Sequence, residues 1–180
     1  MPRRPNRFGG GAQTNVNGLR FEQNTLLDEA LQEIGFEVRE YNVYNGDEKI
    51  GMSVPKHKLY TIFFRKVHID YKKYNSKRWL PDECFISEEK KTAYIIEKKY
   101  QNRAGSVDEK LPGCDFKKKE YEKLFHALDP QYKVEYLYVF NNWFTKESYK
   151  DVLEYITSVG CHYFFNEIPL DFLGLQTDKA

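Results

Sequence analysis

The pattern of apolar and polar positions predicts helices and strands that alternate along most of the chain. Apolar residues spaced three and four apart, as on one face of a helix, occur over residues 19–34, 121–128 and 149–156. Apolar and aromatic runs predict strands over residues 37–44, 58–66, 79–86, 93–100, 134–140 and 162–165. Gly46-Asp47 and Gly51 are typical turn residues between the first two of these strands. The order of the elements predicts an α/β fold, with a central mixed β-sheet flanked by helices.

The most regular pattern lies between residues 79 and 100, where two strands around a polar turn predict a β-hairpin. Because side chains alternate between the two faces of a strand, Glu97 and Lys99 share one face and Lys98 points to the other. A rise of ~3.3 Å per residue places Glu97 and Lys99 ~7 Å apart on that face. If the first strand pairs beside the second, Asp82 reaches the same patch. Two carboxylates and one ammonium would then lie close together, in a set that a divalent metal would organise.

A Glu-x-Lys pattern is weak evidence by itself in so charged a chain, since Glu88-x-Lys90 repeats it in the polar turn. Glu97 and Lys99 are distinguished by their position directly after the apolar residues 94–96. A carboxylate and an ammonium on such a strand are costly unless they are paired or bind a metal. An ordinary surface ion pair at a strand end is the alternative, and the spacing leaves both interpretations open.

Composition limits the classes to which the protein can belong. The 180 residues suffice for one domain with a single core, and a formal net charge of +1 neither requires nor excludes nucleic acid. Three widely spaced cysteines without a Cys-x-x-Cys pattern argue against a disulfide framework and against a zinc site. No apolar run approaches the ~18 residues of a membrane span, and the glycines after the basic N-terminus do not match a signal peptide. We therefore expect a cytoplasmic protein.

Two segments combine basic residues with features that leave their role open. Residues 1–16 are expected to form a flexible basic arm before a single domain over residues 17–180, because the arm cannot bury enough apolar surface to order itself. The arm is either an unordered terminus or a segment that orders against DNA phosphates or in a minor groove. Basic and aromatic residues also alternate over 67–78, which fits either a solvated loop or a surface that faces nucleic acid.

The hairpin and the helix before it resemble the PD-(D/E)XK nuclease superfamily. Pro81-Asp82 is followed after fourteen residues by Glu97-Lys98-Lys99, and Phe21-Glu22 lies in the preceding predicted helix. Within the superfamily, the nearest resemblance is to type II restriction endonucleases. The superfamily core has an α-β-β-β-α-β arrangement, onto which the elements predicted over residues 19–140 can be laid. The resemblance therefore implies a restriction-endonuclease-like core with a central mixed sheet, and metal-dependent hydrolysis of DNA.

Roles for individual residues follow from this resemblance. It implies a Mg²⁺ site, for which Mn²⁺ can substitute, with the ligands Asp82, Glu97 and the backbone carbonyl of Lys98. Lys99 would orient or activate the attacking water and stabilise negative charge in the transition state. Glu22 would bind or position a second metal, although it is most simply explained as a first-turn carboxylate that suits the helix dipole. Gln101 would support the attacking water or touch the DNA backbone if the strand continues that far.

The resemblance also implies partners. These are double-stranded DNA, a second copy of the chain in a homodimer that cuts both strands of a palindromic site, and a cognate DNA methyltransferase. The candidates for DNA contact are Arg3, Arg4, Arg7, Arg103, Ser106, Lys110 and Lys117. Two other functions stay open: a structure- or damage-directed nuclease, such as a resolvase or repair enzyme, and a non-catalytic DNA-binding module.

Overall fold

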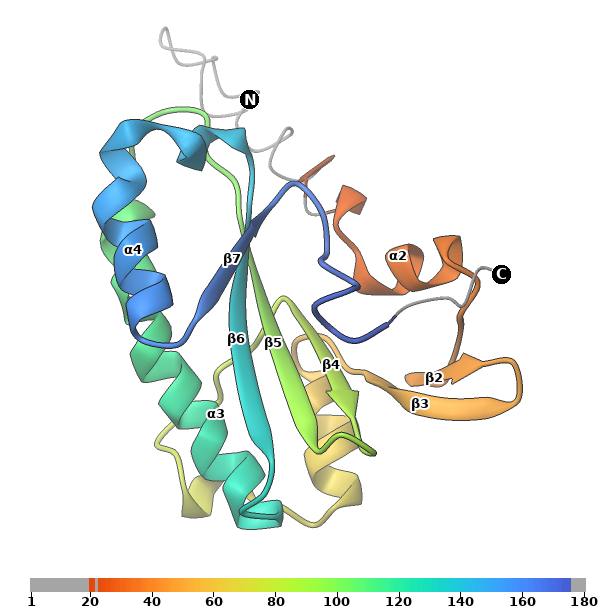
Figure 1. Ribbon diagram of the computed structural model, residues 1–180. Helices are drawn as coiled ribbons and strands as arrows, with labels where there is room; N and C mark the ends of the chain where they lie inside the picture. The colour runs from red at the N-terminus through yellow and green to blue at the C-terminus, as the bar shows by residue number, and fades with distance from the viewer. Residues whose placement is uncertain (1–19, 22, 176–180) are drawn as a thin grey trace, which may run out of the picture.

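The computed structural model describes residues 20, 21 and 23–175, and Figure 1 shows their arrangement. These residues form one seven-stranded sheet in which the strands lie side by side in the order of the sequence. The strands are β1 (Glu37–Arg39), β2 (Asn42–Asn45), β3 (Glu48–Ser53), β4 (Glu83–Ser87), β5 (Thr92–Lys99), β6 (Lys133–Phe140) and β7 (His162–Phe165). Strands β1 to β5 pair antiparallel, whereas β5, β6 and β7 run parallel. The predicted α/β fold with a mixed sheet is confirmed.

Helices cover both faces of the sheet (Figure 1). The helices α3 (Cys114–Leu128) and α4 (Lys150–Ser158) connect the parallel strands and lie on one face, as parallel pairing requires a crossover of this length. The helix α2 (Leu27–Glu33) lies on the opposite face, together with the segment 166–175 that follows β7. The sheet is therefore a middle layer between two apolar clusters.

Strand β5 runs through the centre of this arrangement and is buried on both sides. Ala93 and Ile95 belong to the cluster under α3, and Tyr94 and Ile96 belong to the cluster under α2. Coverage of both faces explains the continuous apolar run 93–96, since an exposed face would favour alternating polar residues. The residues that follow this run lie at the carboxyl ends of the parallel strands, where an α/β sheet commonly binds its ligands.

The prediction of a strand over residues 58–66 is wrong, because Leu59–Phe64 forms a turn of π-helix. Its buried side chains are Leu59, Tyr60, Phe63 and Phe64, whereas Thr61 and Arg65 face solvent. Side chains four apart share a face on a helix, so this segment buries one apolar stripe against α3. Tertiary packing overrides the strand preference of its aromatic and β-branched residues.

The remaining elements match the prediction in type but differ in their bounds. Within the described part of the predicted first helix, Thr25 and Leu26 interrupt the helical backbone before α2. The strand predicted over 37–44 is two strands, because Glu40 and Tyr41 have positive φ angles of 48° and 68° and form a tight turn between β1 and β2. Gly51 is part of β3 and not a turn, and a Cβ at this position would lie 2.7 Å from the Phe85 ring on β4.

No helix within the described residues has the length and apolar composition that crossing a bilayer requires.

Candidate active site

The hairpin of β4 and β5 brings Asp82, which directly precedes β4, level with Glu97 on β5. Glu83 pairs with Ile96 in the antiparallel register, so the next pair along the hairpin is Asp82 with Glu97. Burial raises the pKa of the Tyr121 hydroxyl on α3 well above its ordinary value, and the negative charges of Glu97 and Asp82 add to this shift. Both carboxylates therefore lie within electrostatic reach of the same hydroxyl, as the alternation of side chains along the strands predicts.

Main-chain contacts hold Asp82 in place at the start of β4. The backbone N–H of Lys98 donates to Asp82 Oδ2 over 2.8 Å, which ties this carboxylate to β5. The residues before it are fixed by Tyr60, whose hydroxyl donates to the Trp79 carbonyl at 2.8 Å and accepts from the Trp79 N–H at 3.0 Å. Asp82 is consequently positioned by rigid elements on two sides. Among the described residues, its second oxygen, Oδ1, has no hydrogen-bond partner.

The Glu97 carboxylate lies between two ammonium groups. Lys99 Nζ is 3.0 Å from Glu97 Oε2 and also donates to the Lys98 carbonyl at 3.2 Å. Lys117 Nζ, from the first half of α3, is 3.5 Å from Glu97 Oε1. The Glu97 side chain is only 7 % exposed, whereas the two lysines are 22 % and 25 % exposed. A nearly buried carboxylate is thus matched by cations that reach the surface.

The sequence marked Lys117 as a DNA contact but did not indicate its position beside Glu97. A helical signal was present, because Lys117 lies four residues before Tyr121 and so shares the face of α3 that packs on the sheet. A lysine on that face, near the level at which the sheet carries a carboxylate, is a candidate partner for it. Neither residue type nor local spacing predicts which carboxylate of the sheet will lie beside Lys117 when α3 packs on it.

The oxygen atoms in the site fit a Mg²⁺ ion that substrate would help to hold. Mg²⁺ commonly binds one or two carboxylates and completes its shell with waters and phosphate oxygens. Asp82, Glu97 and the carbonyl of Lys98 offer such hard oxygen donors together at the open end of the hairpin. Among the described residues there is no cluster of three or more His, Cys, Asp or Glu side chains that could bind a metal alone. These oxygen atoms therefore suit an ion that is also coordinated by a phosphate of the substrate, and not an ion that is coordinated by protein side chains alone.

The opposite face of the same hairpin carries a second, buried ion pair. Lys98 Nζ lies 2.8 Å from Glu83 Oε1 and also donates to the Thr25 carbonyl at 3.1 Å. Burial raises the pKa of Glu83, and the charge of Lys98 partly offsets this effect. A cavity of about 370 Å³ adjoins this pair and is lined by Gln23, Leu26, Asp28, Pro55, Lys56, Asp82, Glu83 and Lys98. The Lys98 side chain therefore points away from Glu97, as alternation predicts.

Gln101 lies apart from this site. Strand β5 ends at Lys99, so the condition under which Gln101 would share the face of Glu97 and Lys99 is not met. The Gln101 side chain is buried, and its amide donates to the Tyr149 hydroxyl at 3.3 Å. This hydroxyl also accepts from Trp143 and donates to Asp108. The described contacts of Gln101 connect the end of β5 to the segments around α4 instead of to Glu97.

The other candidate residues fall into two groups. Arg103, Ser106 and Lys110 are exposed on the connection between β5 and α3. Four candidates lie outside the described residues: Arg3, Arg4, Arg7 and Glu22.

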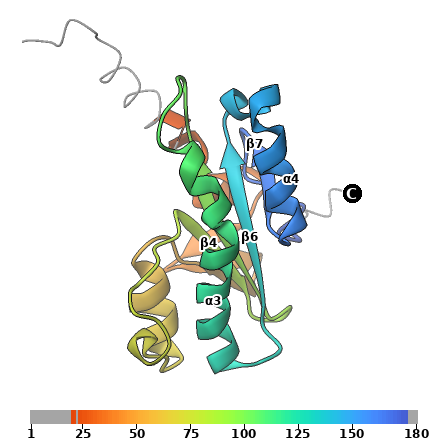
Figure 2. The ribbon, with the colours of Figure 1, turned by 90° about the vertical axis from the view of Figure 1, so that its left-hand side faces the viewer.

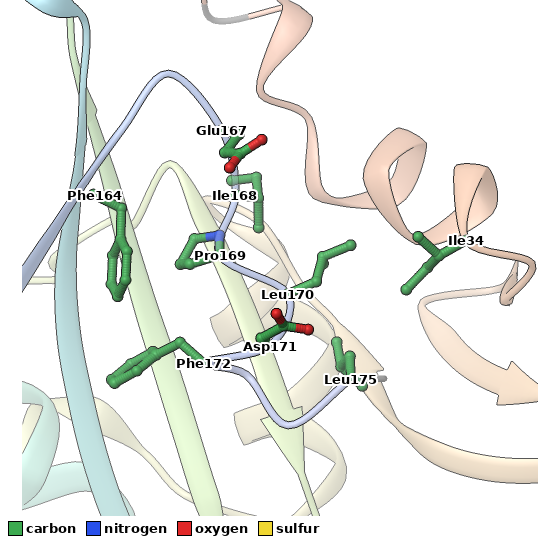
Figure 3. A pocket seen from close by; sticks show the side chains of 9 residues that line it. All are labelled: Ile34, Phe164, Glu167, Ile168, Pro169, Leu170, Asp171, Phe172 and Leu175. Carbon is green, nitrogen blue, oxygen red and sulfur yellow. The ribbon is translucent and has the colours of Figure 1, made fainter. Parts of the chain in front are cut away.

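A wider cavity, of about 610 Å³, opens between α2 and the segment after β7 (Figure 3). Its lining is largely apolar, with rings from Phe164 and Phe172, and its two charged residues are the carboxylates Glu167 and Asp171. None of its lining residues in the described part of the chain is basic. This cavity therefore offers no positive charge to a polyanion. The lysines of the hairpin site are better suited to bind a phosphate backbone.

Comparison with protein families gives one match. A model described as the PD-(D/E)XK nuclease superfamily domain matches residues 14–125, a range that includes the whole hairpin site and Lys117. No curated protein and no solved structure matches the chain.

Proposed function

The chain belongs to the PD-(D/E)XK nuclease superfamily, and from the geometry of its hairpin we propose that it hydrolyses phosphodiester bonds of DNA with Mg²⁺ at Asp82, Glu97 and Lys99. One observation carries the proposal: Glu97, opposite Asp82 on the hairpin, is bracketed by the ammonium groups of Lys99 and Lys117 at 3.0 and 3.5 Å. Carboxylates for a cation beside ammonium groups for a phosphate are the charges that phosphoryl-transfer chemistry uses.

Each residue has a defined task in this mechanism. Asp82, Glu97 and the Lys98 carbonyl would hold the ion, which acts when bound as a Lewis acid toward the scissile phosphate. Lys99 lies next to Glu97 and donates hydrogen bonds, so it would orient the attacking water and stabilise charge that develops on the phosphate. Lys117 approaches the same carboxylate from α3 and would neutralise a second phosphate oxygen. Glu22 would supply a further ligand, whereas Gln101, which is buried against Tyr149, is given no task in this mechanism.

We further propose that the substrate is double-stranded DNA cut at a specific sequence, in the manner of a type II restriction endonuclease. The Pro81-Asp82 and Glu97-Lys98-Lys99 pattern and its similarity to such enzymes support this finer proposal. A homodimer would cut both strands of a palindromic site, and a cognate methyltransferase would protect the host sequence. Arg103, Ser106 and Lys110 would contact the duplex, since they are exposed on the connection between the site and α3.

A structure-directed nuclease is the second candidate, and one observation favours it. The exposed ring of Phe116 contacts Trp79 directly beside the site, and aromatic rings of this kind stack on bases that are not covered by neighbours.

The experiment is a digest of supercoiled plasmid and of a four-way junction with Mg²⁺, Mn²⁺ or EDTA. We expect cleavage with either metal, none in EDTA, and loss of cleavage in Glu97→Ala and Lys99→Ala. Glu89→Ala is the matched control, because it removes an exposed carboxylate in the turn of the same hairpin. Discrete plasmid fragments with one end sequence support the restriction enzyme, and cleavage of the junction alone supports the second candidate. Equal cutting by wild type, Glu97→Ala and Lys99→Ala would refute the assignment of the site.

A further inference from the structure

The exposed ring of Phe116 and the half-buried ring of Trp79, near Glu97, are not used by the chemistry described above. We propose that Trp79 and Phe116, here called the aromatic platform, bind an unpaired nucleotide next to the scissile phosphate. The preferred substrate would then be DNA with a single-stranded or frayed flank at the cut, as for the structure-directed nuclease and not for the restriction endonuclease. This inference rests on the proposed function and adds the class of substrate to it.

The platform consists of two rings from different segments. The Trp79 and Phe116 rings are perpendicular, with centroids 5.7 Å apart, and Phe116 is 55 % exposed. Phe116 is the most exposed large apolar side chain of the described residues. It lies on the first turn of α3, where a polar side chain would be the usual choice for an exposed position. An aromatic ring held open to solvent beside a candidate active site indicates a contact with a ligand or partner.

Positive charge surrounds the platform. Lys77 Nζ is 3.8 Å from the centroid of the Trp79 ring, and Lys117 Nζ is 5.8 Å from the same centroid. Lys72, Lys73 and Arg78 are exposed on the same loop. Aromatic rings between cations suit a partner that offers both a flat apolar face and negative charge, and a nucleotide combines the two.

The platform adjoins the candidate active site through one side chain. Lys117 Nζ contacts Glu97 Oε1 at 3.5 Å and approaches the Trp79 ring at 5.8 Å, so the carboxylate and the ring flank the same ammonium group. A phosphate bound by Lys117 would place the attached nucleotide against Trp79. The base on the platform would therefore neighbour the phosphate that is cut.

The platform is held rigidly before substrate arrives. The Tyr60 hydroxyl binds both the N–H and the carbonyl of Trp79, and Asn75 Nδ2 donates to the Glu120 carbonyl on α3 at 2.9 Å. Figure 2 shows the segment between the helical turn at 59–64 and β4 running beside α3. A surface fixed at both ends has little conformational entropy to lose on binding, which favours affinity.

The geometry of a base determines which nucleotide can use such a platform. In a continuous duplex, both faces of each base are covered by neighbouring base pairs, and only the edges are open in the grooves. Base–aromatic stacking therefore requires a base that has left the stack, as in a single strand, a frayed end or a branch. A second copy of this chain and another protein are the competing occupants. The surrounding lysines and the adjacent Glu97 site favour the nucleotide.

The test measures binding without cleavage, so that it does not depend on catalysis. Glu97→Ala protein in EDTA is titrated against labelled single-stranded DNA, a blunt duplex, and a duplex with a splayed end. We expect Phe116→Ala, added to this background, to weaken binding of the first and third by about tenfold and of the blunt duplex by less than about twofold. Phe116→Trp should restore the affinity. Tyr44→Ala is the control, since the Tyr44 ring pairs with a cation as the Trp79 ring does, Arg39 at 4.2 Å, but lies on β2 at the far side of the sheet.

Each result has a distinct meaning. Equal losses for all three DNAs, or no loss for any, would overturn the platform while leaving the proposed cleavage untouched. Stacking losses as expected, in a protein that cuts no DNA with Mg²⁺, would support the platform and refute the proposed function. Self-association that Phe116→Ala abolishes, with unchanged DNA binding, would identify a second copy as the occupant and overturn the inference. Thermal unfolding of Phe116→Ala checks that the exposed substitution leaves the fold intact.

Discussion

Two neighbouring lysines on β5 form ion pairs of nearly equal length on opposite faces of the sheet. Lys98 lies 2.8 Å from Glu83, and both side chains are at most 5 % exposed. Lys99 lies 3.0 Å from Glu97, but its side chain is 22 % exposed and Lys117 approaches the same carboxylate. The two pairs differ in access to solvent and in the number of cations, not in the chemistry of their partners.

The difference separates a pair that supports the fold from one that is accessible for the catalysis proposed above. Lys98 has its charge compensated by Glu83 and a further bond to the Thr25 carbonyl, within a packed interior. A buried charge pair of this kind is costly to break, because either partner alone would remain charged and desolvated. Lys99 and Lys117 can instead reach water and an incoming phosphate without leaving Glu97. Identical residue types thus take different roles because the faces of one strand differ in burial.

The largest effect on this comparison should come from breaking the buried pair. We expect Glu83→Ala to lower the free energy of unfolding by about 3–5 kcal/mol, since the buried Lys98 ammonium group loses the charge of Glu83. Urea denaturation followed by circular dichroism measures the change. Glu97→Ala should cost about 1 kcal/mol or less, because its lysines can be solvated. The double variant Glu83→Leu/Lys98→Met should recover most of the loss. If Glu83→Ala and Glu97→Ala had the same free energy of unfolding, the two ion pairs would not differ in their contribution to stability.

The next effect concerns the accessible pair and appears in the rate of cleavage. We expect Lys99→Met to lower the single-turnover rate roughly 10²–10³-fold, equivalent to about 2.7–4 kcal/mol of transition-state stabilisation. The thermal unfolding midpoint of Lys99→Met should stay at the wild-type value, whereas that of Lys98→Met should be lower. Rates measured at saturating DNA distinguish this effect from weaker binding. If Lys99→Met cut as fast as wild type, another residue would have to supply the charge.

The smallest effect is the pH dependence of the buried pair. Burial raises the pKa of Glu83, so the native protein keeps this proton at pH values where the unfolded chain has lost it. Stability from this group is fully present below the ordinary pKa of 4.5 and falls as pH rises through the raised native pKa, by at most about 1.4 kcal/mol per pH unit. Glu83→Gln should flatten that fall in urea titrations above pH 4.5. A profile identical to wild type would mean that Glu83 does not titrate in this window.

The sequence predicted the core of the candidate site because its geometry is local. Alternation along one strand determines the faces of Glu97, Lys98 and Lys99, and a hairpin with a short turn determines that Asp82 is their neighbour. These relations need no knowledge of the rest of the fold. The structure has them as predicted, although the roles of these residues in catalysis remain a prediction.

The relations that the sequence missed depend on contacts between distant segments. The segment 58–66 has the composition of a strand, and only its packing on Phe125 of α3 makes it helical. Lys117 contacts Glu97 because the crossover connection determines where α3 lies along the sheet. Gly51 resembles a turn residue but is required where β3 passes close to the Phe85 ring. In each case the deciding partner lies far away in the sequence.

The crossover that carries α3 also determines when the proposed set of catalytic charges is complete during folding. The hairpin brings Asp82 and Glu97 together through neighbouring strands, which is a local event. Lys117 arrives only when α3 docks and β6 pairs with β5, joining Thr92 to Lys133 across the whole crossover. Non-local pairing of this kind forms slowly, because the entropy of closing the loop is lost before the contacts compensate it. A nascent chain would therefore carry an incomplete set of the proposed catalytic charges until its slowest tertiary contacts form.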